Sequence, residues 1–192
     1  MELVFATHNK HKFEEVKKKL PVSITLLSLQ DIHCNEDIPE TGKNIEENAS
    51  QKAFFIYNKF KINCFSDDTG LEVDVLNGKP GVYSARYAGE KPTFLENINK
   101  LLNDVGENPN RNACFRTVIS LVIDGYETQF EGKINGQILS EITGEKGFGY
   151  DPIFKPNNYE ISFAQMELYQ KNQISHRALA TEQLIKYLHE IT

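Results

Sequence analysis

Residues 62–75 read Ile-Asn-Cys-Phe-Ser-Asp-Asp-Thr-Gly-Leu-Glu-Val-Asp-Val. The run from Ile62 to Ser66 is typical of a buried strand, which we expect to end at Asp67-Asp68-Thr69-Gly70. Apolar and acidic residues then alternate as far as Val75, which predicts a half-exposed strand. The carboxyl ends of buried strands are where α/β sheets bind their ligands. This stretch therefore favours an α/β protein and makes Asp67 and Asp68 candidate site residues.

The segments around this stretch alternate between strand and helix patterns. A short apolar run near the N-terminus is followed by a helix that Asn9 caps and Pro21 ends. Farther along, Asp124-Gly125 and Asn135-Gly136 predict turns. The order of the elements predicts an α/β fold with a hairpin-rich sheet and a C-terminal helix. We expect strands over residues 3–6, 24–29, 113–123 and 126–131, and helices over about 43–60, about 92–105 and from Ser175 onward.

Length and composition limit the class of protein. The chain has 192 residues, which is the size of one domain or of a domain with a second lobe. Its 21 basic and 27 acidic residues give a net charge of −6, which disfavours nucleic acid and anionic membranes as partners. No apolar run approaches the roughly 18 residues of a membrane span, and the first residues do not resemble a signal peptide. We therefore expect a single domain over residues 1–192 in the cytoplasm.

The cysteines predict no disulfide framework. Cys34, Cys64 and Cys114 are odd in number and widely spaced, and they form no C-x-x-C motif. We expect three reduced and mostly buried thiols, as is usual in a cytoplasmic protein.

The first candidate site is Thr7-His8-Asn9-Lys10-His11-Lys12. With Asn9 as the cap residue, the next three residues fall in the first helical turn. The positive end of the helix dipole repels cations there, which costs roughly 0.3–1 kcal/mol of stability each. A bound anion is therefore the expected compensation. Backbone N–H groups and Lys12 would together hold a phosphate. A solvated basic surface is the alternative interpretation.

Cations occur near the start of another helix and beside the apolar face of a third. His176 and Arg177 follow the cap residue Ser175 of the last helix, and Lys171 lies just before it. The alternative is that these are exposed side chains whose stems pack on the surface. Lys52 borders the apolar stripe of the second helix, so it either extends along the surface or reaches into a cleft.

Three carboxylates could balance these cations. Asp67 and Asp68 are adjacent in a strand and so point to opposite faces, which means that they need not share one task. Glu40 lies in a loop just before the second helix. Two or three carboxylates, with waters and substrate oxygens, suit Mg²⁺, which rarely uses an all-protein cage. The alternative for Asp67-Asp68 is a turn closed by an Asx hydrogen bond.

Residues 144–152, Gly-Glu-Lys-Gly-Phe-Gly-Tyr-Asp-Pro, form a glycine- and aromatic-rich segment. It matches neither a Walker loop nor a dinucleotide fingerprint. Its glycines permit close approach of the backbone to a ligand, and its aromatic rings could stack on a flat base. An ordinary loop is the alternative.

Taken together, these residues resemble the inosine triphosphate pyrophosphatase family, whose members act on non-canonical purine nucleoside triphosphates. The resemblance runs from Leu3 to about Leu188. Six motifs carry it in order: Thr7-x-Asn9-x-x-Lys12; Glu40 before a helix with Lys52; Ser66-Asp67-Asp68-Thr69-Gly70-Leu71; Pro80-Gly81-Val82-Tyr83-Ser84-Ala85-Arg86; Gly147-Phe148-Gly149-Tyr150-Asp151-Pro152; and Lys171-Asn172-x-x-Ser175-His176-Arg177.

The resemblance implies a fold, a reaction and an assembly. The implied fold is an elongated α/β structure, in which a long mixed sheet with two lobes is flanked by helices around a central active-site cleft. The implied reaction is the Mg²⁺-dependent hydrolysis of ITP, dITP and XTP to the monophosphate and pyrophosphate. It would cleanse the nucleotide pool of deaminated purines. The implied assembly is a homodimer.

The resemblance also implies roles for individual residues. Glu40 and Asp68 are the implied metal ligands, and Asp68 is the implied proton acceptor; whether it acts on water directly or through the metal stays open. The base would contact the aromatic loop and His176-Arg177. The implied substrate-binding residues are Thr7, His8, Asn9, Lys10, His11, Lys12, Lys52, Thr69, Phe148, Gly149, Tyr150, Asp151, Lys171, His176 and Arg177.

Three other functions compete with this interpretation. A nucleotide sensor would bind ITP without cleaving it, although Glu40 and Asp68 argue against a purely binding site. A related pyrophosphatase could act on modified pyrimidines or methylated nucleotides. A nucleic-acid-binding module is least favoured, because the chain is acidic and has no long basic stripe.

Overall fold

The computed structural model describes residues 1–191; the side chain of His11 lies outside that description. The chain divides into two compact units. The first unit comprises Met1–Asp68, Thr117–Glu131 and the chain from Ala180 on, and the second comprises Thr69–Arg116 and Gly132–Leu179. No helix among the described residues is long and apolar enough to cross a membrane.

The sheet of the described chain has seven strands: β1 (Glu2–Phe5), β2 (Thr25–Leu27), β3 (Cys64–Val73), β4 (Lys79–Gly81), β5 (Asn112–Ile123), β6 (Tyr126–Ile138) and β7 (Phe154–Pro156). Backbone hydrogen bonds order them β2-β1-β3-β5-β6-β7, and β4 pairs with β3. β1 is parallel to β2 and β3, whereas the β3–β4 and β6–β7 pairs are antiparallel. The expected mixed α/β fold is therefore confirmed.

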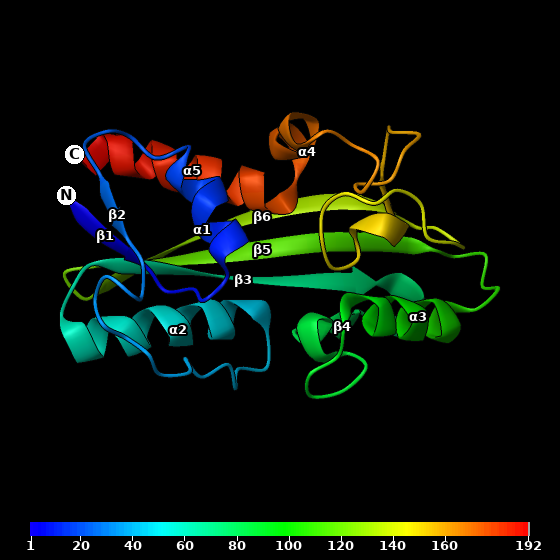
Figure 1. Ribbon diagram of the computed structural model, residues 1–192, viewed down its shortest axis with the longest axis horizontal. Coiled ribbons are helices and arrows are strands. Elements are labelled where there is room, and N and C mark those ends of the chain that lie inside the picture. The colour runs from blue at the N-terminus through cyan, green and yellow to red at the C-terminus, as the bar shows by residue number, and fades with distance from the viewer. Residues whose placement is uncertain (192) are drawn as a thin grey trace. The chain divides into compact units, whose positions relative to one another are not determined.

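The α-helices of the described chain are α1 (Lys10–Lys17), α2 (Ile45–Phe60), α3 (Phe94–Val105), α4 (Leu168–Ile174) and α5 (His176–Ile191). In the first unit, α1 and α5 cover one face of the strands and α2 covers the other (Figure 1). The alternation along β1 explains this division. Leu3 and Phe5 pack in the cluster that contains α1 and α5, whereas Val4 and Ala6 pack with α2.

The second unit has its own apolar core. Leu71 and Val73 of β3 cluster with Leu101 of α3, Phe115 of β5 and Phe154 of β7. The aromatic members make edge contacts, since the Phe115 and Phe154 ring centroids lie 4.6 Å apart at 63°. This core supports the segments that surround Phe148 and α4.

β3 corrects the expectation that a strand ends at Asp67-Asp68-Thr69-Gly70. The strand runs without a break from Cys64 to Val73, so both aspartates lie in its interior. Polar residues remain extended here because side chains from the flanking helices satisfy their carboxylates, as described below. The sequence pattern could not show those partners, which are distant along the chain.

A second correction concerns Asn135-Gly136, where a turn was expected. These residues lie inside β6, and Gly136 pairs with Pro156 of β7. A Cβ atom at Gly136 would lie 2.4 Å from the carbonyl oxygen of Lys155, so glycine permits a close strand pairing rather than a turn. By contrast, Asp124 and Gly125 form the expected turn, with φ angles of 51° and 86°.

The cysteine thiols yield a prediction about chemical reactivity. All three are free, and burial raises the pKa of Cys64 to about 12. Iodoacetamide reacts with the thiolate, which at pH 8 would be present at roughly one part in ten thousand for this pKa. We expect Cys64 to stay unmodified in the native protein and to react in urea, as measured by peptide mass spectrometry. Equal rates in both conditions would contradict this burial.

Candidate active site

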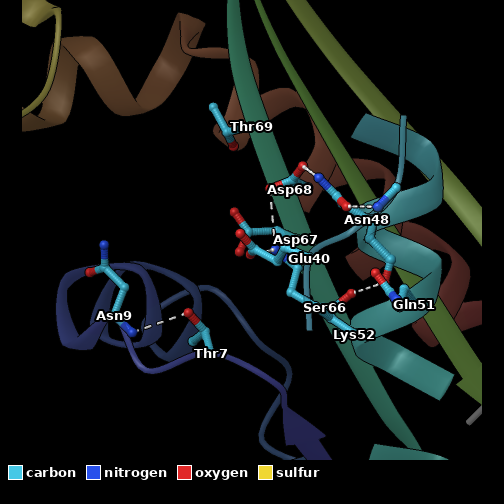
Figure 2. A network of polar contacts seen from close by, with 12 residues as sticks. Thr7, Asn9, Glu40, Asn48, Gln51, Lys52, Ser66, Asp67, Asp68 and Thr69 are labelled. Atoms are coloured by element: carbon cyan, nitrogen blue, oxygen red, sulfur yellow. Dashed lines mark hydrogen bonds and ion pairs between the residues drawn. The ribbon is translucent and has the colours of Figure 1, made fainter. Parts of the chain in front are cut away.

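The start of α1 forms as expected. Asn9 caps the helix, because its Oδ1 accepts a hydrogen bond from the N–H of Lys12 at 3.2 Å. Thr7 Oγ1 in turn accepts one from the N–H of Asn9 at 3.2 Å (Figure 2). No acidic residue occupies the first turn, so the positive end of the helix dipole is suited to an anion. His8 and Lys10 are exposed at this end.

β3 directs Asp67 and Asp68 toward different helices. Phe65 belongs to the cluster that contains α1, and Cys64 belongs to the cluster that contains α2. Because alternate residues share a face, Asp67 points toward α1 and Asp68 toward α2. Both lie on β3 beside Glu40 and Lys52 in Figure 2. The two aspartates therefore have different partners.

Asp67 is paired with Lys12. The Nζ atom of Lys12 lies 2.9 Å from Oδ1 and 2.8 Å from Oδ2 of Asp67. The aspartate side chain is 2% exposed and the lysine side chain 16% exposed, so the pair is largely removed from water. This contact fixes the first turn of α1 against β3.

Lys52 links the other two carboxylates. Its Nζ atom lies 2.5 Å from Glu40 Oε1 and 3.2 Å from Asp68 Oδ1. Burial alone would lower the pKa of Lys52, but the charges of Asp68 and Glu40 outweigh it, and the pKa is raised above its ordinary value. Burial, together with the charge of Glu40, raises the pKa of Asp68 despite the attraction of Lys52.

The acidic groups fit a magnesium ion better than an all-protein metal cage. Among the described residues, no group of three or more His, Cys, Asp or Glu side chains is placed to hold a metal. Glu40 and Asp68 nevertheless each direct an oxygen at the same ammonium group, so both reach one position that a cation occupies. Mg²⁺ in proteins is commonly held by one or two carboxylates, with waters and phosphate oxygens completing its coordination.

A second cluster lies in the second unit, around a buried ion pair. The Nζ atom of Lys171 in α4 lies 2.5 Å from Asp151 Oδ2, and the two side chains are 9% and 4% exposed. The same oxygen accepts a hydrogen bond from the N–H of Phe148 at 2.8 Å. A Cβ atom at Gly147, whose φ is +77°, would lie 2.1 Å from that oxygen, so only glycine fits there.

The Phe148 ring is close to two cations. Lys171 Nζ lies 4.9 Å from the ring centroid and Arg177 Cζ lies 5.5 Å from it. Cations at these distances are attracted to the electron-rich ring face. Gly149 follows with φ of +63°, and the hydroxyl of Tyr150 donates a hydrogen bond to the carbonyl oxygen of Ser84 at 2.9 Å. The glycine- and aromatic-rich segment is thus held in place rather than being a loose loop.

α5 begins after the expected cap residue Ser175, whose Oγ accepts a hydrogen bond from the N–H of Ala178 at 3.2 Å. His176 is 4% exposed and stacks on Phe115, with ring centroids 4.6 Å apart and 12° between the planes. Arg177 is 5% exposed, and its Nη2 lies 3.5 Å from the hydroxyl of Thr69. Both side chains lie inside the second unit rather than in solvent.

The expected residues therefore form two clusters of different chemistry. The cluster in the first unit is charged and contains Thr7, Asn9, Lys12, Glu40, Lys52, Asp67 and Asp68. The cluster in the second unit is aromatic and cationic and contains Thr69, Phe148, Asp151, Lys171, His176 and Arg177.

Sequence reasoning missed Asn48 and Phe115. The Nδ2 atom of Asn48 donates a hydrogen bond to Asp68 Oδ2 at 3.2 Å. A signal for Asn48 existed, because it is a polar residue inside the apolar stripe of α2, four residues before Lys52. Phe115 had no such signal, since an apolar residue in a strand is ordinarily part of a core.

Comparisons with known proteins relate the chain as a whole to a family. A family model described as the Ham1 family matches residues 3–187. A dITP/XTP pyrophosphatase of Christiangramia forsetii is 55% identical over 188 residues, which are 98% of this chain and 99% of that one. The corresponding protein of Porphyromonas gingivalis is 50% identical over 97% of each chain. The solved Staphylococcus aureus Ham1 protein superposes with a TM-score of 0.94 at 39% identity over 100% of both chains.

Proposed function

The chain belongs to the Ham1 family, and from that premise we propose that it hydrolyses ITP, dITP and XTP to the nucleoside monophosphate and pyrophosphate. The reaction would remove deaminated purines from the nucleotide pool. The observation that carries the proposal is the buried Lys52 ammonium group between the carboxylates of Glu40 and Asp68. These groups supply both the positive charge that a phosphate needs and the oxygen ligands that Mg²⁺ prefers.

The polyphosphate would bind the first unit. The backbone N–H groups at the start of α1 and the ammonium groups of Lys12 and Lys52 carry the charge that phosphate oxygens require. Further proposed contacts along this segment are Thr7, His8, Asn9, Lys10 and His11, of which the side chain of His11 lies outside the described structure.

Mg²⁺ is the proposed metal. Glu40 and Asp68 would hold it, because their oxygens already converge on one cationic group. When bound, the ion neutralises charge on the phosphates as bond breaking proceeds. Chelation of the metal with EDTA should therefore stop pyrophosphate release, and added Mg²⁺ should restore it.

Asp68 is the proposed proton acceptor for the attacking water. In the metal-free protein, Lys52 holds one oxygen of the Asp68 carboxylate, and burial raises the pKa of Asp68 above its ordinary value. Protonation removes the acceptor, so activity should fall as the pH drops through the pKa of Asp68.

The base would bind the second unit. The aromatic ring of Phe148 offers a stacking surface, and the segment around Gly149 and Tyr150 is fixed in place. Lys171 and Asp151 anchor this loop, and Thr69 adjoins Arg177. Arg177 and His176 supply donors that suit the 6-oxo group of inosine or xanthine.

Arg177→Ala is expected to weaken the preference for ITP over ATP. Inosine presents an acceptor at position 6 and adenine presents a donor, so the guanidinium group favours the oxo base. A buried donor left unsatisfied costs about 1–3 kcal/mol, which corresponds to roughly 5–150-fold in discrimination. The ratio of kcat/KM values for the two nucleotides measures this. Arg116→Ala, which breaks the 2.9 Å contact with Glu72, is the matched control. An unchanged ratio in Arg177→Ala would disprove the role in base reading.

One assay separates the competing functions. Pyrophosphate release should be measured with ITP, XTP, dUTP, GTP and ATP in the presence of Mg²⁺. Fast release from ITP and XTP supports the proposal, whereas binding of ITP without cleavage would indicate a sensor. Preference for dUTP would indicate a pyrimidine-directed enzyme.

We also propose a homodimer in the cytoplasm. Three large apolar side chains of the second unit, Tyr83, Phe94 and Leu95, are 54–60% exposed, and a partner protomer that covered them would remove apolar surface from water. The free thiols and a nucleotide substrate fit the cytoplasm. Analytical ultracentrifugation at micromolar concentration tests the dimer.

A further inference from the structure

Asn48 is a buried polar residue that the proposed reaction does not yet use. It lies in α2, one turn before Lys52, and is 1% exposed. Its Nδ2 donates a hydrogen bond to Asp68 Oδ2 at 3.2 Å, and its Oδ1 accepts one from the N–H of Gly42 at 2.8 Å. Gly42 is two residues after Glu40, so one side chain contacts both Asp68 and the loop that carries Glu40.

The loop is held closely against α2. The N–H of Thr41 donates a hydrogen bond to Gln51 Oε1 at 2.8 Å, and Gln51 Nε2 donates one to Thr41 Oγ1 at 2.9 Å. A Cβ atom at Gly42 would lie 2.8 Å from Asn48 Oδ1, so the glycine permits this approach. The position of Glu40 is therefore set by α2 as well as by its own ion pair.

Asn48 and Lys52 contact different oxygens of the Asp68 carboxylate. Lys52 contacts Asp68 Oδ1 and Glu40 Oε1, which are oxygens that a metal ion would need. Asn48 contacts the other oxygen of Asp68 and a backbone N–H. A metal ion would compete with Lys52 for its contacts but would leave those of Asn48 in place.

We propose that Asn48 is a positioning residue, which orients the Asp68 carboxylate and holds the Glu40 loop so that both carboxylates can bind one metal ion. The inference rests on the proposed function, because it assigns these carboxylates to the metal. Removing a group that orients a metal ligand typically lowers metal affinity or activity by about 10–100-fold. Unlike an ion pair, the amide does this without adding charge to the site.

A second buried asparagine supplies a matched control. Asn97 lies in α3 and is 4% exposed. Its Oδ1 accepts a hydrogen bond from the N–H of Ala88 at 2.8 Å, and its Nδ2 donates one to the carbonyl oxygen of Ala85 at 3.2 Å. It thus tethers a loop to a helix as Asn48 does, but both of these hydrogen bonds are to backbone groups and neither is to a carboxylate.

The experiment compares Asn48→Leu, Asn48→Ser and Asn97→Ser with the wild-type protein. Leucine keeps the side-chain volume and removes both hydrogen bonds, and serine is the milder change if leucine prevents folding. Mn²⁺ affinity without nucleotide is measured from the EPR signal of the free ion, and kcat and KM are measured with ITP. Thermal melting reports stability. We expect the Asn48 variants to lose about 10–100-fold in kcat or Mn²⁺ affinity, with KM changed by less than about threefold.

For the control variant Asn97→Ser, we expect the opposite pattern of effects. We expect Asn97→Ser to lower the melting temperature while kcat and Mn²⁺ affinity stay near wild-type values. Wild-type kcat and Mn²⁺ affinity in a folded Asn48→Ser would overturn the proposal, and so would equal losses in Asn97→Ser. Failure of the wild-type protein to cleave ITP would instead count against the proposed function, and the Mn²⁺ measurement would still test Asn48.

Discussion

Replacing Asp68 with asparagine is expected to lower kcat for ITP by at least about 10²–10⁴-fold while the protein stays folded. The amide has nearly the same shape as the carboxyl group, but it accepts no proton from water and is a weak metal ligand. Pyrophosphate release at saturating ITP and Mg²⁺ measures the loss. Asp74→Asn, which changes an exposed carboxylate in the same stretch, is the control and should keep wild-type turnover.

The pKa of Asp68 predicts what the same variant does to stability. Because burial raises this pKa, the folded state favours the protonated form, and that contribution to stability is present below the ordinary pKa and lost as the pH rises through the raised value. At neutral pH the ionised carboxylate therefore opposes folding. Asparagine stays neutral, so the melting temperature of metal-free Asp68→Asn should equal or exceed that of the wild type.

In the turnover assay, a near-normal kcat in folded Asp68→Asn would disprove the proposed role of Asp68 as proton acceptor.

Asp151→Asn is expected to lower the free energy of unfolding by about 3–5 kcal/mol, because it leaves the Lys171 ammonium group buried without its counter-charge. The amide oxygen can still accept the hydrogen bond from Phe148, so the loss reports mainly the ion pair. Urea denaturation followed by circular dichroism measures it. A value below about 1 kcal/mol, the range of surface pairs, would contradict the buried pair.

A double variant separates the ion pair from general damage. Asp151→Asn combined with Lys171→Met removes both charges, and a buried pair replaced as a whole commonly costs little. The double variant should therefore be more stable than Asp151→Asn alone. A double variant that is less stable than either single change would show that packing around Phe148, and not charge, dominates this region.

Helix positions were predictable because their signals are local. Thr93 and Glu96 form the capping box at the start of α3, and Ser175 caps α5. The start of α1 was predictable in the same way from Asn9. The helix ends at Lys17, however, and not at Pro21 as expected. Each of these features is encoded within four or five neighbouring residues.

The expectations for β3 and for Gly136 were wrong, and α4 was missed, for a different reason. β3 continues through Asp67-Asp68 because Lys12 and Lys52 satisfy the two carboxylates, and those lysines are 55 and 16 residues away. Gly136 is a strand residue because the backbone of Lys155 approaches it closely. α4 was missed because its seven residues give too short a pattern. Non-local contacts of this kind leave no periodic trace in the sequence.

The pairing of the lysines in the first unit has a consequence for selectivity among anions. Lys12 and Lys52 share their site with Glu40, Asp67 and Asp68, so these five side chains have a formal charge of −1 rather than a positive charge. Free phosphate or sulfate gains little Coulomb energy from such a site and should be a poor inhibitor. A triphosphate that arrives with its own divalent cation brings the missing positive charge with it. We therefore expect the site to favour a metal–nucleotide complex over simple anions such as phosphate and sulfate.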